Sequence, residues 1–274
     1  MSVFLIRLAF KNLTRHRKRT LITAGVIAMA IFFYLFLDSM LIGMTDEALN
    51  SIIDFESGHL QVVNSKYWEE RKEMPLENLI TFDEQLQDKI KEIEGFQGLA
   101  PQLDFSARLN NGIDELPVMC KGIKPENEKK VFATHKYFVK GSMFSAGENK
   151  VVMGKRLADL MEVKTGDYIT LLIRTKEDTF NTIEAEISGL LYTPNSNINE
   201  NVVYVPLATA RQALNLDDKI SKISVRLKQR KNASGKAQAL TRNLSNNIKT
   251  YSWKDSADSL MNMMQAQEKE NQIV

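Results

Sequence analysis

An unbroken apolar run from Leu21 to Leu37, directly behind a strongly basic segment, is the feature that most constrains this chain. At about 1.5 Å per residue the run spans roughly 25 Å, and apolar residues as far as Met44 complete the ~30 Å core of a bilayer. We therefore predict a transmembrane helix over residues 21–44. Among the side chains that we expect to lie within the membrane are Leu21, Ile27, Ile31, Phe33 and Leu37.

The charge before the apolar run predicts how the helix crosses the membrane. The first twenty residues carry six basic side chains and no acidic one. Lys and Arg beside a membrane helix stay on the cytoplasmic side, so the domain after the helix should be extracytoplasmic. The residues that we expect to set this orientation are Arg15, Arg17, Lys18 and Arg19. Residues 1–20 also mix apolar and basic side chains, which predicts a cytoplasmic amphipathic elbow in contact with membrane lipids.

Two other interpretations of this segment fit less well. A cleaved secretory signal has an apolar core of about 7–15 residues followed by a small-x-small cleavage site. The sequence after the run, Asp38-Ser39-Met40-Leu41, offers no such site. A buried core helix of a soluble protein does not require an unbroken apolar run beside a one-sided block of charge.

Composition separates the anchor from the rest of the chain. Outside residues 1–37 the chain carries 30 basic and 34 acidic side chains, so the overall positive excess lies at the anchor. This distribution gives no indication of nucleic-acid binding. Because Cys120 is the only cysteine, the chain cannot form an internal disulfide, and we expect Cys120 to be a small core residue.

Beyond the membrane the pattern predicts an α+β domain. The helix should continue outward as a stalk over residues 45–55 and end at Gly58, and Asn110-Asn111-Gly112 should form a tight turn between two strands. The other predicted strands cover residues 59–63, 151–153, 168–174, 182–192, 202–205, 219–227 and 250–253. The other predicted helices cover residues 82–94, 154–161 and 233–248, one that begins at Pro206 and one that begins at Lys254.

Several segments in a fixed order resemble the extracytoplasmic domain of the bacterial ABC3 permeases, which include the lipoprotein-releasing, MacB-like and FtsX types. They are Lys121-Gly122-Ile123-Lys124-Pro125-Glu126, Val139-Lys140-Gly141, Val151-Val152-Met153-Gly154-Lys155-Arg156, Val163-Lys164-Thr165-Gly166-Asp167 and Asn201-Val202-Val203-Tyr204-Val205-Pro206-Leu207. The stretch from Ala9 to Thr20 is also similar to the start of such permeases. The resemblance extends over nearly the whole chain.

The resemblance implies an outer domain of two subdomains. A βαβ-type part near the membrane would comprise residues 56–98 and 218–253, and a mostly β part, residues 99–217, would be inserted in it. Residues 254–274 would form a return stalk, cut off before a second transmembrane helix, because such permeases normally have four. Its packing against the first stalk would use Met44, Leu49, Ile52, Leu260 and Met264. We therefore expect the chain to be a fragment or a partial gene.

The resemblance also implies a non-catalytic subunit that works with a cytoplasmic ABC ATPase and a second permease subunit, as a homodimer or a heterodimer, in the bacterial inner membrane. Lipoprotein release fits better than macrolide export, because the chain begins at the elbow without an ATPase domain. A lipoprotein or a periplasmic carrier would be a further partner. The short stretch Thr175–Asn181 lacks the proline-containing hook that recruits a carrier, which makes carrier binding by this subunit less favoured.

The sequence contains no pattern that predicts catalysis. The glycines around Lys155 have the wrong spacing for a phosphate loop, and no Ser or Thr follows the lysine. His16, His59 and His135 are too far apart in the sequence to indicate a metal site, so we expect no cofactor. Two other functions stay open: a single-pass sensor or anchored binding domain, and, less favoured, an anchored extracytoplasmic enzyme.

Overall fold

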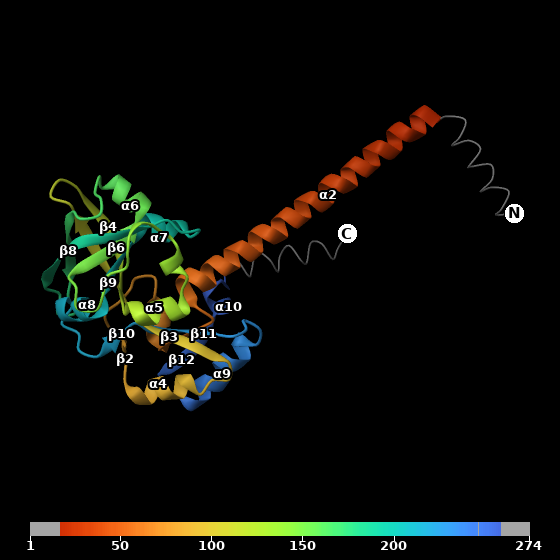
Figure 1. Cartoon of the computed structure of the whole chain (residues 1–274). Coiled ribbons are helices and arrows are strands. Elements are labelled where there is room, and N and C mark those ends of the chain that lie inside the picture. The colour runs from red at the N-terminus through yellow and green to blue at the C-terminus, as the bar shows by residue number, and fades with distance from the viewer. Residues whose placement is uncertain (1–16, 246, 259–274) are drawn as a thin grey trace. The chain divides into compact units, whose positions relative to one another are not determined.

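The computed structural model describes residues 17–245 and 247–258, and the chain divides into two compact units, residues 1–49 and 50–274 (Figure 1). Each unit is described by itself. Three residues predicted to act in orientation or stalk packing, Arg15, Leu260 and Met264, lie outside the described residues.

The first unit contains most of helix α2 (Arg17–Ile52). Its side chains are apolar around the whole circumference and exposed: Leu21 is 71% exposed and Phe33 is 53% exposed. Among the described residues α2 is the one helix long and apolar enough to cross a membrane. A surface this apolar requires lipid or another apolar partner around it, which agrees with the predicted membrane span.

The second unit contains a mixed sheet whose strand order is β12-β1-β11-β3-β4-β9-β6-β8-β5, with β7 paired to both β3 and β8. The strands of this sheet are β1 (Leu60–Asn64), β3 (Phe96–Asn110), β4 (Glu115–Ile123), β5 (Phe138–Gly141), β6 (Lys150–Gly154), β7 (Tyr168–Arg174), β8 (Phe180–Leu191), β9 (Val202–Pro206), β11 (Lys222–Leu227) and β12 (Ile248–Ser252). A small separate sheet pairs β2 (Ile80–Thr81) with β10 (Lys219–Ile220).

One end of the large sheet has the order of a split βαβ fold. This end contains β1, β3, β11 and β12, named in chain order, and a long segment separates β3 from β11. In the sheet they lie in the order β12-β1-β11-β3, and each is antiparallel to its neighbour. Helices α4 (Glu84–Lys91) and α9 (Ala233–Asn243) supply the two crossovers and lie against each other (Figure 1). This arrangement is typical of ferredoxin-like folds.

The segment between β3 and β11 closes into a barrel. Strands β3, β4, β9, β6, β8 and β7 pair in turn, and β7 returns to β3, so the ring has no free edge. Buried side chains alternate along β7 (Ile169, Leu171 and Ile173) as expected for strands that face a packed interior. Cys120 is fully buried opposite Val203 of β9, so the prediction of a core cysteine is confirmed.

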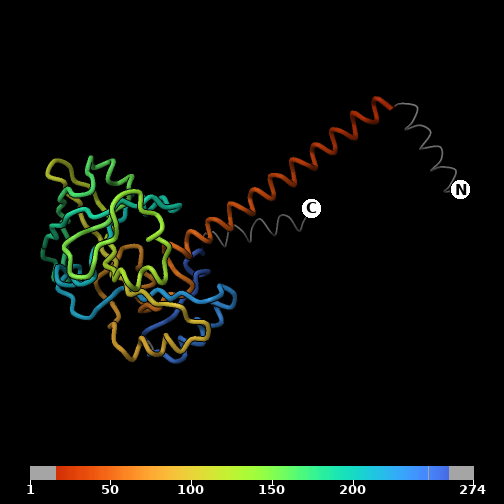
Figure 2. The backbone as a smooth tube through the Cα atoms, viewed as in Figure 1, coloured from red at the N-terminus to blue at the C-terminus, as the bar shows by residue number. Residues whose placement is uncertain are grey.

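Strand β3 belongs to both parts of the fold. Its first half pairs with β11 and its second half pairs with β7, while β4 follows its other edge from Gln102 to Asn110. The backbone can be followed through this shared strand in Figure 2. The boundary between residues 98 and 99, which the sequence suggested for two subdomains, stays a prediction.

The remaining helices are short and cover the sheet and its connections. They are α3 (Ser65–Glu70), α5 (Pro125–Val131), the 3-10 turn η2 (Thr134–Lys136), α6 (Lys155–Leu160), α7 (Ser196–Asn201), α8 (Leu207–Ala213) and α10 (Trp253–Ser256). Helix α5 packs on β3 and β11, and α8 packs on β4. Gly122 of β4 has no room for a side chain, because an added Cβ would lie 2.9 Å from Cβ of Ala210 in α8.

Three predicted elements differ from the structure. A single strand over residues 219–227 is wrong: at Ser221 the chain leaves the small sheet and enters the large one, where the Ser221 amide donates to the Gln102 carbonyl at 3.0 Å. The helix predicted to reach residue 248 ends at Asn243, because the chain turns there into β12. Pro206 is the last residue of β9 and the N-cap of α8, not part of its first turn.

Candidate functional site at the end of the apolar helix

The apolar helix ends in a π-helical turn, η1 (Ile53–Ser57), which we call the helix foot. Residues Ile53, Phe55 and Ser57 are buried, unlike most of the helix before them. The Gly58 amide donates to the Ile53 carbonyl at 3.1 Å, and Gly58 has φ +65°, a conformation that glycine adopts without strain. The helix therefore ends at Gly58 as the sequence predicted, whereas a stalk over residues 45–55 stays a prediction. Single π turns are frequent at functional sites.

Asp54 connects the foot to the βαβ end of the sheet. Arg226 of β11 donates from Nη1 to Asp54 Oδ1 at 2.6 Å, and the Ala133 amide donates to the Asp54 carbonyl at 3.0 Å. Both charged side chains are about one-third exposed, so the pair contributes little to stability. The pair is a direct contact between the foot and β11.

Glu56 connects the foot to the loop after the barrel strand β8. Asn195 donates from Nδ2 to Glu56 Oε1 at 2.7 Å, and the side chain of Gln61 donates to the Glu56 carbonyl at 3.2 Å. Asn195 is also the N-cap of α7, where its Oδ1 accepts from the Ile198 amide at 3.2 Å. One side chain therefore fixes both the foot and the start of α7.

Phe55 packs into the apolar core beside the barrel. Its ring meets Tyr137 edge to face with centroids 5.3 Å apart, and it belongs to a buried cluster with Tyr204 of β9 and Val152 of β6. Truncation of a buried phenylalanine typically costs about 3–5 kcal/mol. The foot is therefore held by apolar packing as well as by hydrogen bonds.

The beginning of the second unit and helix α10, near the end of the described residues, meet at the foot. His59 lies between β11 and the start of α10: its amide donates to the Val225 carbonyl at 2.8 Å, and its carbonyl accepts from the Trp253 amide at 3.1 Å. Its Nδ1 accepts from the Leu227 amide at 3.0 Å. Burial, together with Arg226, lowers the pKa of His59 to about 4, so the ring is neutral at pH 7. Helix α10 lies against the foot.

Buried polar side chains of β3, α5 and β11 form pairs with one another. Gln102 of β3 donates to Glu128 of α5 at 3.2 Å, and Lys222 of β11 forms an ion pair with Asp104 at 2.6 Å. Burial raises the pKa of Glu128 to about 7, although Lys121 and Gln102 act in the opposite direction. Sequence patterns did not single out these residues, because each lies in an ordinary strand or helix and they meet only in the fold.

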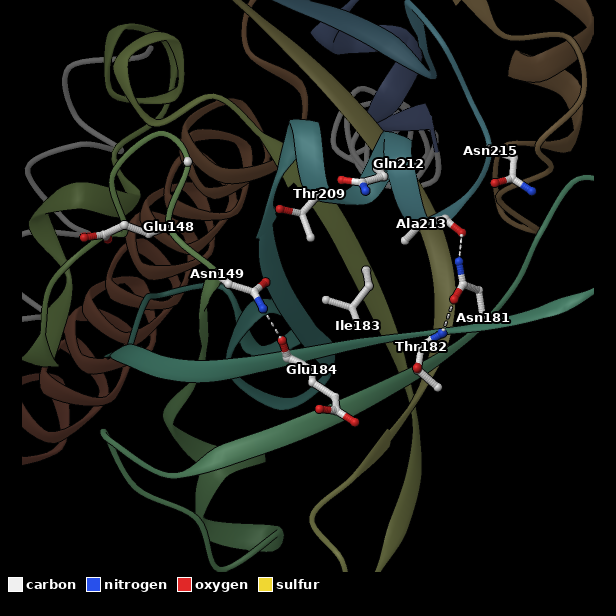
Figure 3. A pocket seen from close by; sticks show the side chains of 11 residues that line it. Glu148, Asn149, Asn181, Thr182, Ile183, Glu184, Thr209, Gln212, Ala213 and Asn215 are labelled. Atoms are coloured by element: carbon white, nitrogen blue, oxygen red, sulfur yellow. Dashed lines mark hydrogen bonds between the residues drawn. The ribbon is translucent and has the colours of Figure 1, made fainter.

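A separate hollow of about 630 Å³ lies between β8, α8 and the loop before β6 (Figure 3). Two of its polar side chains are used by the fold: Asn149 donates to the Glu184 carbonyl at 2.6 Å, and Asn181 donates to the Ala213 carbonyl at 2.9 Å. Within residues 17–245 and 247–258, no group of three or more His, Cys, Asp or Glu side chains could hold a metal ion.

The structure places the described residues of the predicted orientation and membrane sets on α2. Arg17, Lys18 and Arg19 are in its first turn, and the apolar side chains follow. Of the predicted stalk residues, Met44 is 59% exposed, Leu49 is buried and Ile52 immediately precedes the foot. Stalk packing between the two ends of the domain stays a prediction. The foot was missed because a π turn has no sequence pattern of its own.

Comparisons with known proteins agree in pointing to one group. A family model described as the MacB-like periplasmic core domain matches residues 20–243. The lipoprotein-releasing system transmembrane protein LolE of Haemophilus influenzae is 31% identical over 90 residues, which are 32% of this chain and 21% of LolE. The match thus spans about a fifth of the length of that relative.

Two solved structures are similar to this one. The periplasmic region of MacB from Actinobacillus actinomycetemcomitans has a TM-score of 0.54 at 12% identity, over 77% of this chain and 96% of that chain. The extracellular domain of the noncanonic ABC-type transporter YknZ from Gram-positive bacteria has a TM-score of 0.49 at 14% identity, over 71% of this chain and 100% of that chain. The similarity to the MacB structure shows that the two proteins share a fold. At 12% identity it shows nothing about function.

Proposed function

Because this chain belongs to the MacB-like periplasmic core domain family, we propose that it is a permease subunit of an ABC transporter. It is a membrane protein with an extracytoplasmic domain. In this proposal it lies in the bacterial inner membrane, and its N-terminus is in the cytoplasm. A separate ABC ATPase subunit would hydrolyse ATP in the cytoplasm. A second permease subunit, identical or different, and membrane lipids would complete the assembly.

The helix foot is the observation that carries a mechanism for this role. Helix α2 passes into the foot without a loop, and the foot is fixed to β11 through Asp54, to the loop before α7 through Glu56 and to the apolar core through Phe55. We infer that a movement of the helix reaches the outer domain through these contacts of the foot. Coupling of ATP hydrolysis to movement of the outer domain is the proposed mechanism.

Lipoprotein release is the transport task that we favour. The curated relative LolE belongs to a lipoprotein-releasing system, although the match covers about a fifth of its length. The substrate would be a lipoprotein or another hydrophobic molecule. A periplasmic carrier could receive it, with the recruiting contact supplied by this subunit or by its partner.

Affinity purification of the full-length protein from its native membrane tests the assembly. We expect an ATP-binding subunit to co-purify, and we expect deletion of the gene to leave lipoproteins in the inner membrane. Normal lipoprotein sorting in the deletion strain, together with no ATP-binding subunit in the purified material, would rule out the proposal.

A single-pass sensor or binding domain is the alternative, since it would use the same anchor and outer domain without an ATPase. The reading frame beyond Val274 distinguishes the two. Three further apolar spans are expected of a permease, and a stop codon at that point would favour the sensor.

A further inference from the structure

A polar cavity of about 230 Å³ lies beside the helix foot, at the point where the βαβ end of the sheet meets the barrel. It is lined by side chains from several separate parts of the fold, among them Glu56 of the foot, Tyr67 of α3, Asp104 of β3, Lys121 of β4 and Ser256 of α10. At roughly 30 Å³ per water molecule, this volume suits a compact ligand of a few heavy atoms.

The cavity contains a buried lysine that makes no direct pair with the residues around it. Lys121 is 5% exposed, and its ammonium makes no hydrogen bond or ion pair with the residues that the structure describes. Burial lowers the pKa of Lys121 and the neighbouring Lys222 lowers it further, while the carboxylates of Asp104, Glu56 and Glu128 act in the opposite direction without forming an ion pair with it. Fully buried lysines are rare unless they are paired, so an anion at this point would relieve an unfavourable arrangement.

Other buried polar atoms around the cavity also lack partners. The hydroxyl of Ser256 and Oδ1 of Asp104 have no hydrogen-bond partner among the described residues, although Asp104 Oδ2 is paired with Lys222. The Tyr67 hydroxyl is buried and has only a weak interaction with Ser221 that falls short of hydrogen-bond geometry. An unpaired buried polar group is unfavourable, and a bound ligand that pairs with it would remove that cost.

The chemistry of these groups specifies a ligand. Three side chains can donate hydrogen bonds: Lys121, Tyr67 and Ser256. A phosphate has enough oxygens to accept from all three, whereas a carboxylate has only two oxygens. The free oxygen of Asp104 is an acceptor and requires a hydroxyl or ammonium donor next to the anion. Arg71 and Lys72 also line the cavity, so basic side chains outnumber acidic ones around it.

We propose that this cavity binds a phosphate ester of a small alcohol or amino alcohol, with the phosphate at Lys121 and the alcohol or amine at Asp104. The ligand can be a free molecule or the head group of a phospholipid, since both present the same chemistry. Bound ligand would connect α3, β3, β4 and α10 beside the foot. It would thereby stiffen the part of the outer domain that receives the movement of α2.

Isothermal titration of the full-length protein in detergent tests this proposal, with inorganic phosphate and sn-glycerol 3-phosphate as probes. We expect saturable binding, tighter for sn-glycerol 3-phosphate because only that probe offers an alcohol hydroxyl to Asp104 in addition to its phosphate. Lys121→Met removes the ammonium and keeps the apolar stem, so it should fold and should weaken binding by about tenfold or more. Lys129→Met, at an exposed position of α5, is the matched control and should bind like the wild type.

The source of the ligand is decided by a competition between free sn-glycerol 3-phosphate and mixed micelles that contain phosphatidylglycerol. Displacement of the free probe by these micelles, but not by phosphatidylcholine micelles, identifies a lipid head group. Binding of the free probe without displacement identifies a soluble ligand. No saturable binding of either probe, or equal binding by Lys121→Met, would show that the cavity holds water alone and would overturn the proposal.

Discussion

At the scale of single residues, Glu128 is the side chain whose charge the fold opposes most clearly. It is 2% exposed, and burial raises its pKa from 4.5 to about 7. The unfolded chain loses its proton at lower pH than the folded chain, so stability falls as pH rises from about 4.5 to 7 and then stays level.

Glu128→Gln removes this dependence, because the amide is neutral at every pH and can still bond to Gln102. We expect the variant to gain stability over the wild type as pH rises, reaching about 3 kcal/mol above pH 7, where the charged carboxylate is buried in the wild type. Urea unfolding at pH 4.5, 6 and 8 measures the difference. Glu126→Gln, exposed on the same helix, is the control. A gain that does not change with pH would contradict the assignment.

Cys120 should be chemically inert in the folded protein. The thiol is fully buried in the barrel, and burial raises its pKa well above the ordinary value. We expect a thiol reagent at pH 8 to label it only as fast as the protein unfolds, and at once in denaturant. Rapid labelling without denaturant would show that the barrel opens to solvent around Cys120.

At the scale of elements, Gly58 determines how the foot passes into β1. It combines φ +65° with close neighbours, since an added Cβ would lie 3.0 Å from the Val225 carbonyl oxygen. Gly112 also has a positive φ, of +92°, but its added Cβ would meet nothing within 4 Å.

Gly58→Ala should therefore destabilise the protein by about 1–3 kcal/mol more than Gly112→Ala, because both substitutions strain the backbone but only the first also displaces β11. Chemical denaturation of the two variants gives this comparison directly. Equal losses would mean that the neighbours of Gly58 yield without cost.

Elements that repeat a local pattern could be predicted from the sequence, whereas elements that depend on distant partners could not. The strand over residues 168–174 was predicted with the observed bounds because the turn Thr165-Gly166-Asp167 comes directly before it. The closure of the barrel by β7 against β3 is invisible in the sequence, because residues 107–110 and 170–173 pair over a long separation. The break at Ser221 was missed for the same reason: its partners are Gln102 and Asp104.

At the scale of the whole molecule, the predicted family is confirmed by the match over residues 20–243. Order and spacing of short segments were enough for this, because the segments lie in strands, turns and helix starts that build the fold. The functional junction was harder to foresee. In the sequence, the foot residues resemble ordinary stalk residues. Their partners come from distant parts of the chain: Arg226 for Asp54, Asn195 for Glu56 and Tyr137 for Phe55.

The central claim is that the foot transmits movement from the membrane helix to the outer domain. A Gly-Gly-Ser insertion between Ile52 and Ile53 should break this link while leaving the domain folded, and the same insertion between Asn111 and Gly112, in an exposed turn, is the control. Both are assayed in proteoliposomes that contain the full transporter with its ATPase subunit and a lipoprotein. The account predicts that the foot insertion lowers lipoprotein release by about tenfold or more while ATP hydrolysis stays within about twofold of the control. Release at the rate of the control would contradict it.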